Sequence, residues 1–523
     1  MPPDLIHRRR WWTLVILSIS LVVISLDNTI LNVALPSIAA DLGASPSQLQ
    51  WIVDAYMLVF AGTMLTAGAL GDRFGRKRAL TTGLVVFGTG SLLAALSGDA
   101  TQLIASRALM GIGGALIMPS TLSILTAVFP AEERGKAIGA WAAVTGIGIA
   151  VGPVAGGWLV EHADWHWVFL VNLPIVALAL GLGRFLVPES RDPQQARIDL
   201  PGATLSIAGL TALLWGLIEA PARGWTSPAI LGAFGGAFVL LALFAAWELR
   251  TSTPMLDVRL FRNRRFSIAS ASIALAFFGL FGVLFATAQY LQNVHGFAPL
   301  KAGLWSLPVA LGLVIGGPLA AKLSQRLGTK VTVAGGLATV AGGLLLYSTA
   351  EPGSGFALIG GAQVVLGLGM GLAMAPATDS IMGAVPIDRA SVGSAMNDTV
   401  RLVGGSLGVA VLGSLLASHY RDGMDGAAHG LPGSASATAH ESIAGAGAVA
   451  ERIGGTAGRA LHDAAGVAFV DAMQVAMVVA AAVVLAGAAL ALAFLPAREG
   501  APAEVAEPRL PAGAAPLAEP VAA

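Results

Sequence analysis

Long apolar runs, repeated along the whole chain, constrain its fold more than any other feature. Several exceed about 18 residues, which at roughly 1.5 Å of rise per residue lets a helix cross a bilayer. Only 11% of the 523 residues are charged, whereas soluble domains typically have about 25%. The chain therefore lacks the polar surface to cover itself in water. The sequence predicts an all-α polytopic membrane protein.

We expect fourteen transmembrane helices, most of them bounded by charged or Gly/Pro-rich turns. Their ranges are 12–36, 49–70, 79–98, 101–123, 137–159, 166–187, 203–219, 228–248, 266–291, 302–321, 330–350, 356–377, 392–416 and 467–495. The first run follows Arg8, Arg9 and Arg10 and is too long for a signal-peptide core, so we interpret it as a retained span.

The distribution of basic residues supports this count. With the N-terminus placed in the cytoplasm, 23 of the 30 Lys and Arg residues fall in inside segments and 5 in outside segments. Inside segments of membrane proteins carry such an excess, and a miscounted span would invert the alternation downstream of it. We therefore expect both termini to be cytoplasmic.

A faint internal repeat suggests how the spans are grouped. The second span ends in 68–78 and the tenth in 317–328, and both segments pass from a Gly-rich helix into a basic turn. Two related bundles around a midplane site are a transporter design. The expected divisions are an N-terminal six-helix bundle (1–198), two inserted helices (199–250), a C-terminal six-helix bundle (251–497) with a long outside loop (418–466), and a disordered cytoplasmic tail (498–523).

Asp27 is a carboxylate deep inside the first span, where hydrocarbon cannot solvate it. Helix rise places it about 24 Å from the inner boundary, and places Arg107 of the fourth span about 9 Å from the outer one. In a core near 30 Å these depths are similar. Asp54 of the second span falls in the same layer. The three residues are our candidate proton site.

The chemistry expected there is a balance between two effects on one carboxyl group. Burial disfavours the charged form, and a nearby guanidinium favours it. If the effects nearly cancel, Asp27 can exchange a proton and respond to cargo or helix movement. Asp398 and Arg401, three residues apart in the thirteenth span, are further candidates for proton coupling. The alternative is a static buried ion network.

Two glycine-containing motifs suggest moving parts. Gly71-Asp72-Arg73-Phe74-Gly75-Arg76 lies at the cytoplasmic end of the second span, where Asp72 can bind an Arg or a helix N-terminus and act as a gating latch. In the fifth span, the small residues make a smooth face for close helix packing and the proline bends the helix. That motif comprises Gly148, Gly152, Pro153, Gly156 and Gly157. The alternatives are a basic topogenic loop and a generic packing face.

Several functions are disfavoured by what the sequence lacks. It has no cysteine, no Gly-x-x-x-x-Gly-Lys-Ser/Thr loop and no zinc signature. The histidines of 418–466 are irregularly spaced and are expected to be solvated rather than metal ligands. We expect no cofactor, no metal, no nucleic-acid partner and no direct use of ATP.

Four segments resemble one family over nearly the whole chain. They are 26–36, 68–78, 107–115 and 148–157, with a further likeness at 376–408. The chain resembles the fourteen-span drug:proton antiporters (QacA/EmrB-like multidrug exporters) of the major facilitator superfamily. Lys322 departs from the pattern, since an acid often stands there, so no matching gating charge is assigned to the second half.

This resemblance implies alternating access, in which protons enter as a drug leaves. It implies a secondary transporter rather than an enzyme, located in a bacterial cytoplasmic membrane and driven by the proton gradient. The expected partners are a small lipophilic or cationic substrate, protons and lipid, and the expected state is a monomer. The alternatives are a transporter of a single metabolite on the same scaffold and a non-transporting membrane sensor.

Overall fold

The computed structural model describes residues 3–190, 199–251, 254, 256, 258–385, 390–428 and 431–496. Every regular element in these ranges is helical, as expected for an all-α membrane protein. The tail at 498–523, which the sequence predicts to be disordered, lies outside the described residues.

The helices follow one another along the chain in three groups. The first group is α1 (Pro3–Leu42), α2 (Pro46–Phe74), α3 (Arg76–Ala95), α4 (Ala100–Val128), α5 (Ala131–His162), α6 (Trp167–Leu170) and α7 (Asn172–Leu186). Next come α8 (Leu200–Arg223) and α9 (Pro228–Arg250). The last group is η1 (Val258–Arg262), α10 (Arg264–Gln289), η2 (Tyr290–Val294), α11 (Pro299–Trp305), α12 (Pro308–Leu327), α13 (Thr329–Tyr347), α14 (Phe356–Ala384), α15 (Ala390–Met424), α16 (Gly433–Glu441), α17 (Ile443–Ile453) and α18 (Gly455–Phe494).

Local sequence sets several of these boundaries. Ser45 and Gln48 form a capping box at the start of α2, and proline follows at the first helical position. Asp99 caps α4 in a similar way by accepting from the Gln102 amide. Gly75 separates α2 from α3 with φ of 119°, a conformation that L side chains rarely adopt.

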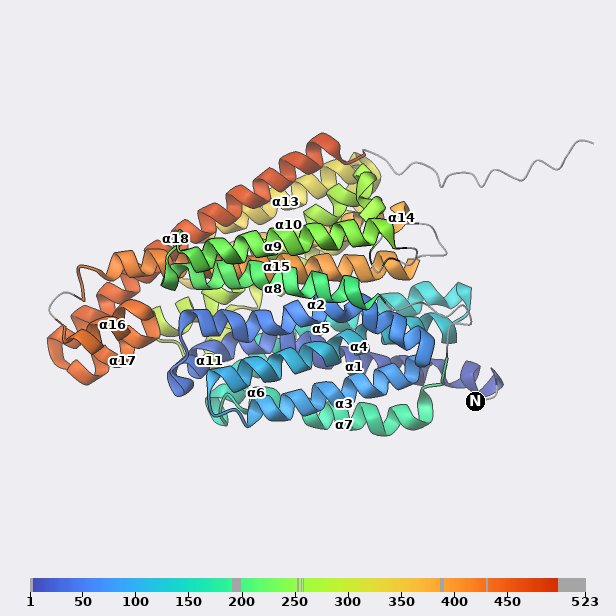
Figure 1. Cartoon of the computed structure of the whole chain (residues 1–523), viewed down its shortest axis with the longest axis horizontal. Coiled ribbons are helices and arrows are strands. Elements are labelled where there is room, and N and C mark those ends of the chain that lie inside the picture. Colours follow the sequence, from blue (N-terminus) through green and yellow to red (C-terminus); the bar gives the residue numbers. More distant parts are fainter. Residues whose placement is uncertain are drawn as a thin grey trace, which may run out of the picture.

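The buried apolar side chains form two large clusters. One extends over residues 14–187 and also includes Phe285 and Val409. The other extends over residues 266–495. Figure 1 shows the early helices, in blue, on one side of the molecule and the late helices, in yellow to red, on the other, with α8 and α9 running alongside them. The long helices are roughly parallel, as in a membrane bundle.

Within the described residues, twelve helices are long and apolar enough to cross a membrane, or thirteen when α2 is counted as one span bent by 52°. The expected fifth span, 137–159, lies within α5, a 32-residue helix outside that count. The sixth and tenth expected spans are each divided into two helices by a short break. The sixth corresponds to α6 and α7, and the tenth to α11 and α12. The chain is a multi-pass membrane protein.

The segment 418–466 differs from the expected loop. α15 continues to Met424, α18 begins at Gly455, and α16 and α17 occupy most of the interval. Alanine is the strongest helix former, and this segment is rich in it, which favours helix despite the glycines. In Figure 1 the α16–α17 pair projects beyond one end of the bundle, away from the N-terminus.

Candidate transport site

A sealed ion pair joins α1 to α4. The Arg107 guanidinium lies 2.5 Å from the Asp27 carboxylate, and the two side chains are only 1% and 0% exposed. Arg107 also donates from Nε to the Ile52 carbonyl of α2 at 3.1 Å. Depth along the helices placed these two charges at a similar level, and the structure brings them into contact.

Other polar and aromatic groups complete the surroundings of this pair. The Asn172 amide lies 3.5 Å from the second Asp27 oxygen and 3.1 Å from the Ser91 hydroxyl. The guanidinium of Arg107 also lies over the Tyr56 ring, 4.4 Å from its centroid, in a cation–π contact. The side chains of Asn172 and Tyr56 therefore contact the two charges, and Ser91 in turn positions Asn172, so the pair is fixed in a buried site.

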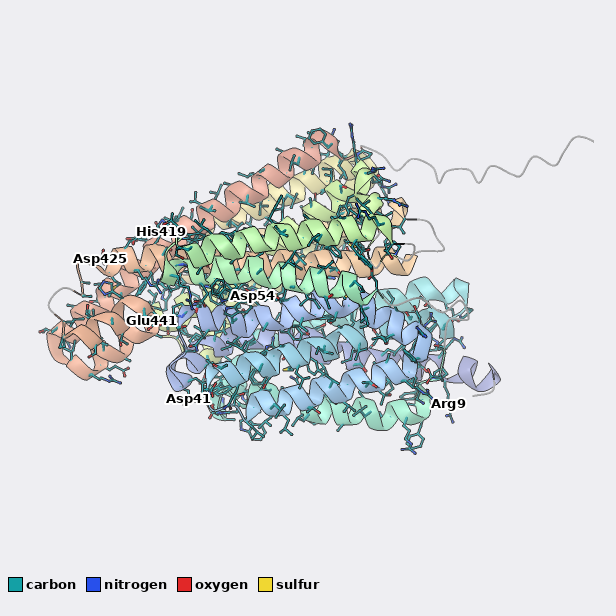
Figure 2. The ribbon with its side chains drawn as sticks, viewed as in Figure 1. Arg9, Asp41, Asp54, His419, Asp425 and Glu441 are labelled. Carbon is teal, nitrogen blue, oxygen red and sulfur yellow. The ribbon has the colours of Figure 1, made fainter. Side chains whose placement is uncertain are left out.

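Asp54 is equally buried but does not join this pair. It is 0% exposed, and its Oδ1 accepts a hydrogen bond of 2.7 Å from Ser406 of α15. Among the described residues, its Oδ2 has no hydrogen-bond partner, and no ion pair links it to Arg107. Figure 2 shows Asp54 nearer the end of the bundle that carries Asp41 and Glu441 than the end that carries Arg9. The expected depth agrees, but the expected three-residue cluster does not form.

A cavity of about 130 Å³ lies between the early and late helices. Its walls are mostly apolar, with a few polar groups and one ion pair. The lining residues are Leu21, Ile24, Ser25, Asn28, Thr29, Asn32, Val33, Phe60, Met118, Pro153, Phe277, Leu280, Phe281, Leu284, Ala288, Ser306, Val309, Ala310, Leu313, Met370, Met374, Asp398, Arg401 and Leu402. Pockets for drug-sized ligands are usually about 300–1,000 Å³, so such a ligand requires the helices to move apart.

Asp398 and Arg401 form the ion pair on this cavity wall. Both belong to α15, and their side chains meet at 3.2 Å. The Arg401 guanidinium also lies 4.8 Å from the centroid of the Phe277 ring of α10. The expected pairing along one helix face is confirmed.

The glycines of α5 permit close approach to two partners. A Cβ added at Gly148, Gly152 or Gly156 would collide with Ser25, Thr29 or Ile30 of α1. One added at Gly157 would collide with the backbone of Pro299 and Leu300 in α11. The Leu300 amide also donates to Glu161 of α5 at 3.1 Å. The small face therefore packs α5 against both the early and the late helices, as expected for a smooth helix surface.

The turn after α2 is held by residues from the end of the early group. Asp72 pairs with Arg76 at 2.7 Å. The Lys77 amide donates to Glu189 at 3.1 Å, and the Arg76 amide donates to the Ser190 carbonyl at 3.0 Å. Asp72 thus binds an arginine of the next helix, one of the partners expected for it. Gly71 and Arg73 lie in the last turn of α2, and Gly75 directly follows that helix.

Sequence reasoning missed several neighbours of these residues. Asn172, Ser406 and Phe277 lie 145, 352 and 124 residues from Asp27, Asp54 and Arg401, respectively, so no local pattern links them. The sequence does offer a reason to expect a polar partner for Asn172, because a buried amide within a membrane helix is costly without one. The sequence offers no such reason for Glu189, since acidic residues are common in loops.

The fold and this cavity define a membrane transporter: helical bundles surround a central, largely apolar chamber that contains a few polar groups. The chain belongs to the Major Facilitator Superfamily, whose sequence profile matches residues 17–409. The expected family is confirmed, and the protein is a transporter rather than an enzyme.

Several relatives of this chain are drug-efflux proteins. The chain is 38% identical over 458 residues to the multidrug efflux pump LfrA of Mycolicibacterium smegmatis, which covers 87% of this chain and 90% of the relative. It is 36% identical to the tetracenomycin C resistance and export protein of Streptomyces glaucescens, over 80% of this chain and 78% of the relative. The expected relationship to drug exporters is therefore confirmed.

A solved structure shares the fold. It is a bacterial homologue of the human lysosomal transporter Spinster, in an inward-facing and unoccupied conformation. The similarity covers 93% of this chain and 98% of that one, with a TM-score of 0.64 and 19% sequence identity. At this identity the likeness extends to the fold alone.

Proposed function

We propose that the protein exports small lipophilic or cationic drugs or antibiotics in exchange for protons. The bundles at 1–198 and 251–497 would alternate around the central cavity, with the inserted helices of 199–250 alongside them. In this proposal α5 is the fourteenth span and both termini face the cytoplasm of a bacterium. The protein acts as a monomer and is driven by the proton gradient without a cofactor.

The observation that carries the proposal is the sealed pair of Asp27 and Arg107 beside the cavity. The residues that follow Asp27 on α1, Asn28 and Thr29, line the cavity itself. Removing the charge of one member of a buried ion pair leaves the other uncompensated, which is strongly unfavourable. A proton on Asp27 would therefore weaken the contact between α1 and α4 and alter the cavity wall.

The other candidate coupling residues lie at two different places, one between the groups of helices and one on the cavity wall. Asp54 is bonded to Ser406 across the two groups of helices, so relative movement of the bundles would change its only described partner. Asp398 and Arg401 lie in the cavity, where cargo would meet them directly. In the proposed cycle, Asp27 and Asp54 respond to protons and movement, and Asp398 links the cargo to that response.

The two glycine-containing motifs would control access from either side. The turn at Gly71–Arg76, stabilised by Asp72 and Glu189, would latch the cytoplasmic end. The contact of Gly157 with α11 would close the outer end. Protons would load from outside and leave to the cytoplasm while the drug moves outward.

Everted membrane vesicles that contain the protein test this function. A pH gradient should drive uptake of ethidium by the wild type, and an uncoupler should abolish it. Asp27→Asn should insert at the wild-type level and lose the gradient-driven uptake. Asp41→Asn is the matched control on the same helix, because Asp41 bonds to Trp165 and does not line the cavity.

Undiminished, uncoupler-sensitive uptake by Asp27→Asn would refute the role of the ion pair. A wild type that moves one metabolite but no drug in a substrate panel would favour the single-metabolite alternative. A wild type that moves no tested compound under the pH gradient would favour the sensor alternative.

A further inference from the structure

Two ion pairs within the described membrane helices have different access to the cavity. The side chains of Asp27 and Arg107 are 0% and 1% exposed and do not line it, whereas those of Asp398 and Arg401 are 10% and 22% exposed and do. Among the described lining residues, Asp398 and Arg401 are the only charged ones. Any charge on a cargo molecule therefore meets this pair.

The guanidinium of Arg401 has a particular environment. Its carboxylate partner lies at 3.2 Å, and its aromatic partner, Phe277, lies at 4.8 Å. Phe277 is itself stacked with Phe281, at 6.0 Å between ring centroids and 29° between planes. A carboxylate and an aromatic face are the groups that bind a flat, delocalised cation. An aromatic organic cation would find the same two groups favourable.

The pair is also suited to being opened. Both members belong to α15, so separating them does not break a link between helices. The partial exposure of both side chains means that each can be solvated or take another partner, unlike a fully sealed pair. Nearby apolar side chains such as Leu280 and Met374 would cover the rest of a lipophilic molecule.

We propose that Arg401 occupies the place of the cargo, and that an aromatic monocation replaces its guanidinium on Asp398 and Phe277. This inference rests on the proposed efflux function and adds the residues that would bind a cationic cargo. Asp398 is then the residue that selects cations, and Arg401 is an internal competitor for it. A neutral cargo leaves the pair intact, and an anionic one gains nothing from Asp398.

Competition of this kind predicts opposite effects for the two charges. Removing Arg401 frees the carboxylate and should strengthen the binding of a cation. Neutralising Asp398 should weaken cation binding and should also cancel any gain from removing Arg401. A pair with a purely structural role would weaken all ligands alike in both variants.

The test measures equilibrium binding to the purified full-length protein in lipid nanodiscs, with tetraphenylphosphonium as the cation and triphenylphosphine oxide as a neutral relative. The readout is the ratio of the two affinities. Arg401→Gln should raise this ratio at least about threefold, and Asp398→Asn should lower it about tenfold. The double variant should match Asp398→Asn.

Arg223→Gln is the matched control. Arg223 pairs with Glu219 on α8 at 3.1 Å and lies 5.3 Å from the centroid of the Trp215 ring, but none of the three lines the cavity. Its ratio should equal that of the wild type. An unchanged ratio in Asp398→Asn, or a ratio in Arg401→Gln that falls, would overturn the inference.

Uptake into vesicles separates this inference from the function on which it rests. If the wild type accumulates the probes on a pH gradient while Asp398→Asn keeps the wild-type affinity ratio, efflux stands and the inference fails. If the variants change the affinity ratio as expected but the wild type accumulates neither probe, the efflux function fails and the cation site stands.

Discussion

Ser406 donates a hydrogen bond of 2.7 Å to Asp54, which lies 352 residues away along the chain. The donor lies on α15 and the acceptor on α2, so this bond links the late helices to the early ones. Both side chains are buried. It is thus a polar contact that relative movement of the two groups of helices must break or distort.

Removal of this donor should destabilise the structure described here. Ser406→Ala leaves a carboxyl group without its described hydrogen bond, and such bonds between membrane helices are worth about 0.6–2 kcal/mol. We expect a loss of this size in the free energy of unfolding in mixed micelles. In the Asp54→Asn background, Ser406→Ala should cost a different amount, because the acceptor is then an amide. Equal costs in both backgrounds would show that the hydroxyl does not act through Asp54.

The same bond shows where sequence reasoning reaches its limit. Helix rise fixes depth in the membrane, so the similar levels of Asp27 and Arg107 could be calculated from position in the chain. Depth does not fix the direction in which a side chain points. Asp54 was expected in the same layer and bonds to α15 instead of Arg107, because the face of α2 that carries it is set by packing between distant segments. The partners Asn172 and Phe277 were missed for that reason.

The helical segments themselves were largely predictable, because hydropathy and basic-residue asymmetry are properties of the chain alone. The expected ranges and the observed helices coincide at most positions. The interval 418–466 differs, since glycine content suggested a loop while alanine and packing favour α16 and α17. There, Tyr420 donates to the Ala439 carbonyl at 3.1 Å, and Ala446 is fully buried.

The arginine of the sealed pair should be more costly to remove than a surface charge. Arg107→Met leaves the Asp27 carboxylate buried without its cationic partner, which costs about 3–5 kcal/mol for pairs of this kind. The double variant Asp27→Asn, Arg107→Met removes both charges and should recover part of that loss. The measurement is the free energy of unfolding in mixed micelles. A single variant as stable as the double one would show that the carboxylate needs no partner.

The turn between α2 and α3 should require glycine at position 75. Its φ of 119° is unfavourable for an L side chain, and an added Cβ would lie 2.6 Å from Oε1 of Glu189. We expect Gly75→Ala to cost roughly 1–3 kcal/mol of stability and to reduce gradient-driven uptake.

Gly98→Ala provides the control for this glycine. No atom lies within 4 Å of a Cβ added at Gly98, and its φ lies outside the positive range in which side chains are strained. Gly98→Ala should leave both the stability and the gradient-driven uptake near the wild-type values. A Gly75→Ala protein that unfolds and transports like Gly98→Ala would contradict a role for this turn in the cytoplasmic latch.

Close approach of α11 to α5 should keep the cavity closed on the outer side. A Cβ added at Gly303 would collide with the Pro153 carbonyl, so Gly303→Ala should push the two helices apart. Because the chain has no cysteine, Ser306→Cys places a single thiol in the cavity wall. A membrane-impermeant thiol reagent added outside intact cells should label this thiol about tenfold faster in the Gly303→Ala background, the response to roughly 1.4 kcal/mol of bias between conformations. Gly317→Ala is the control, since nothing lies within 4 Å of its Cβ position. Equal labelling in the two backgrounds would show that this contact does not close the outer side.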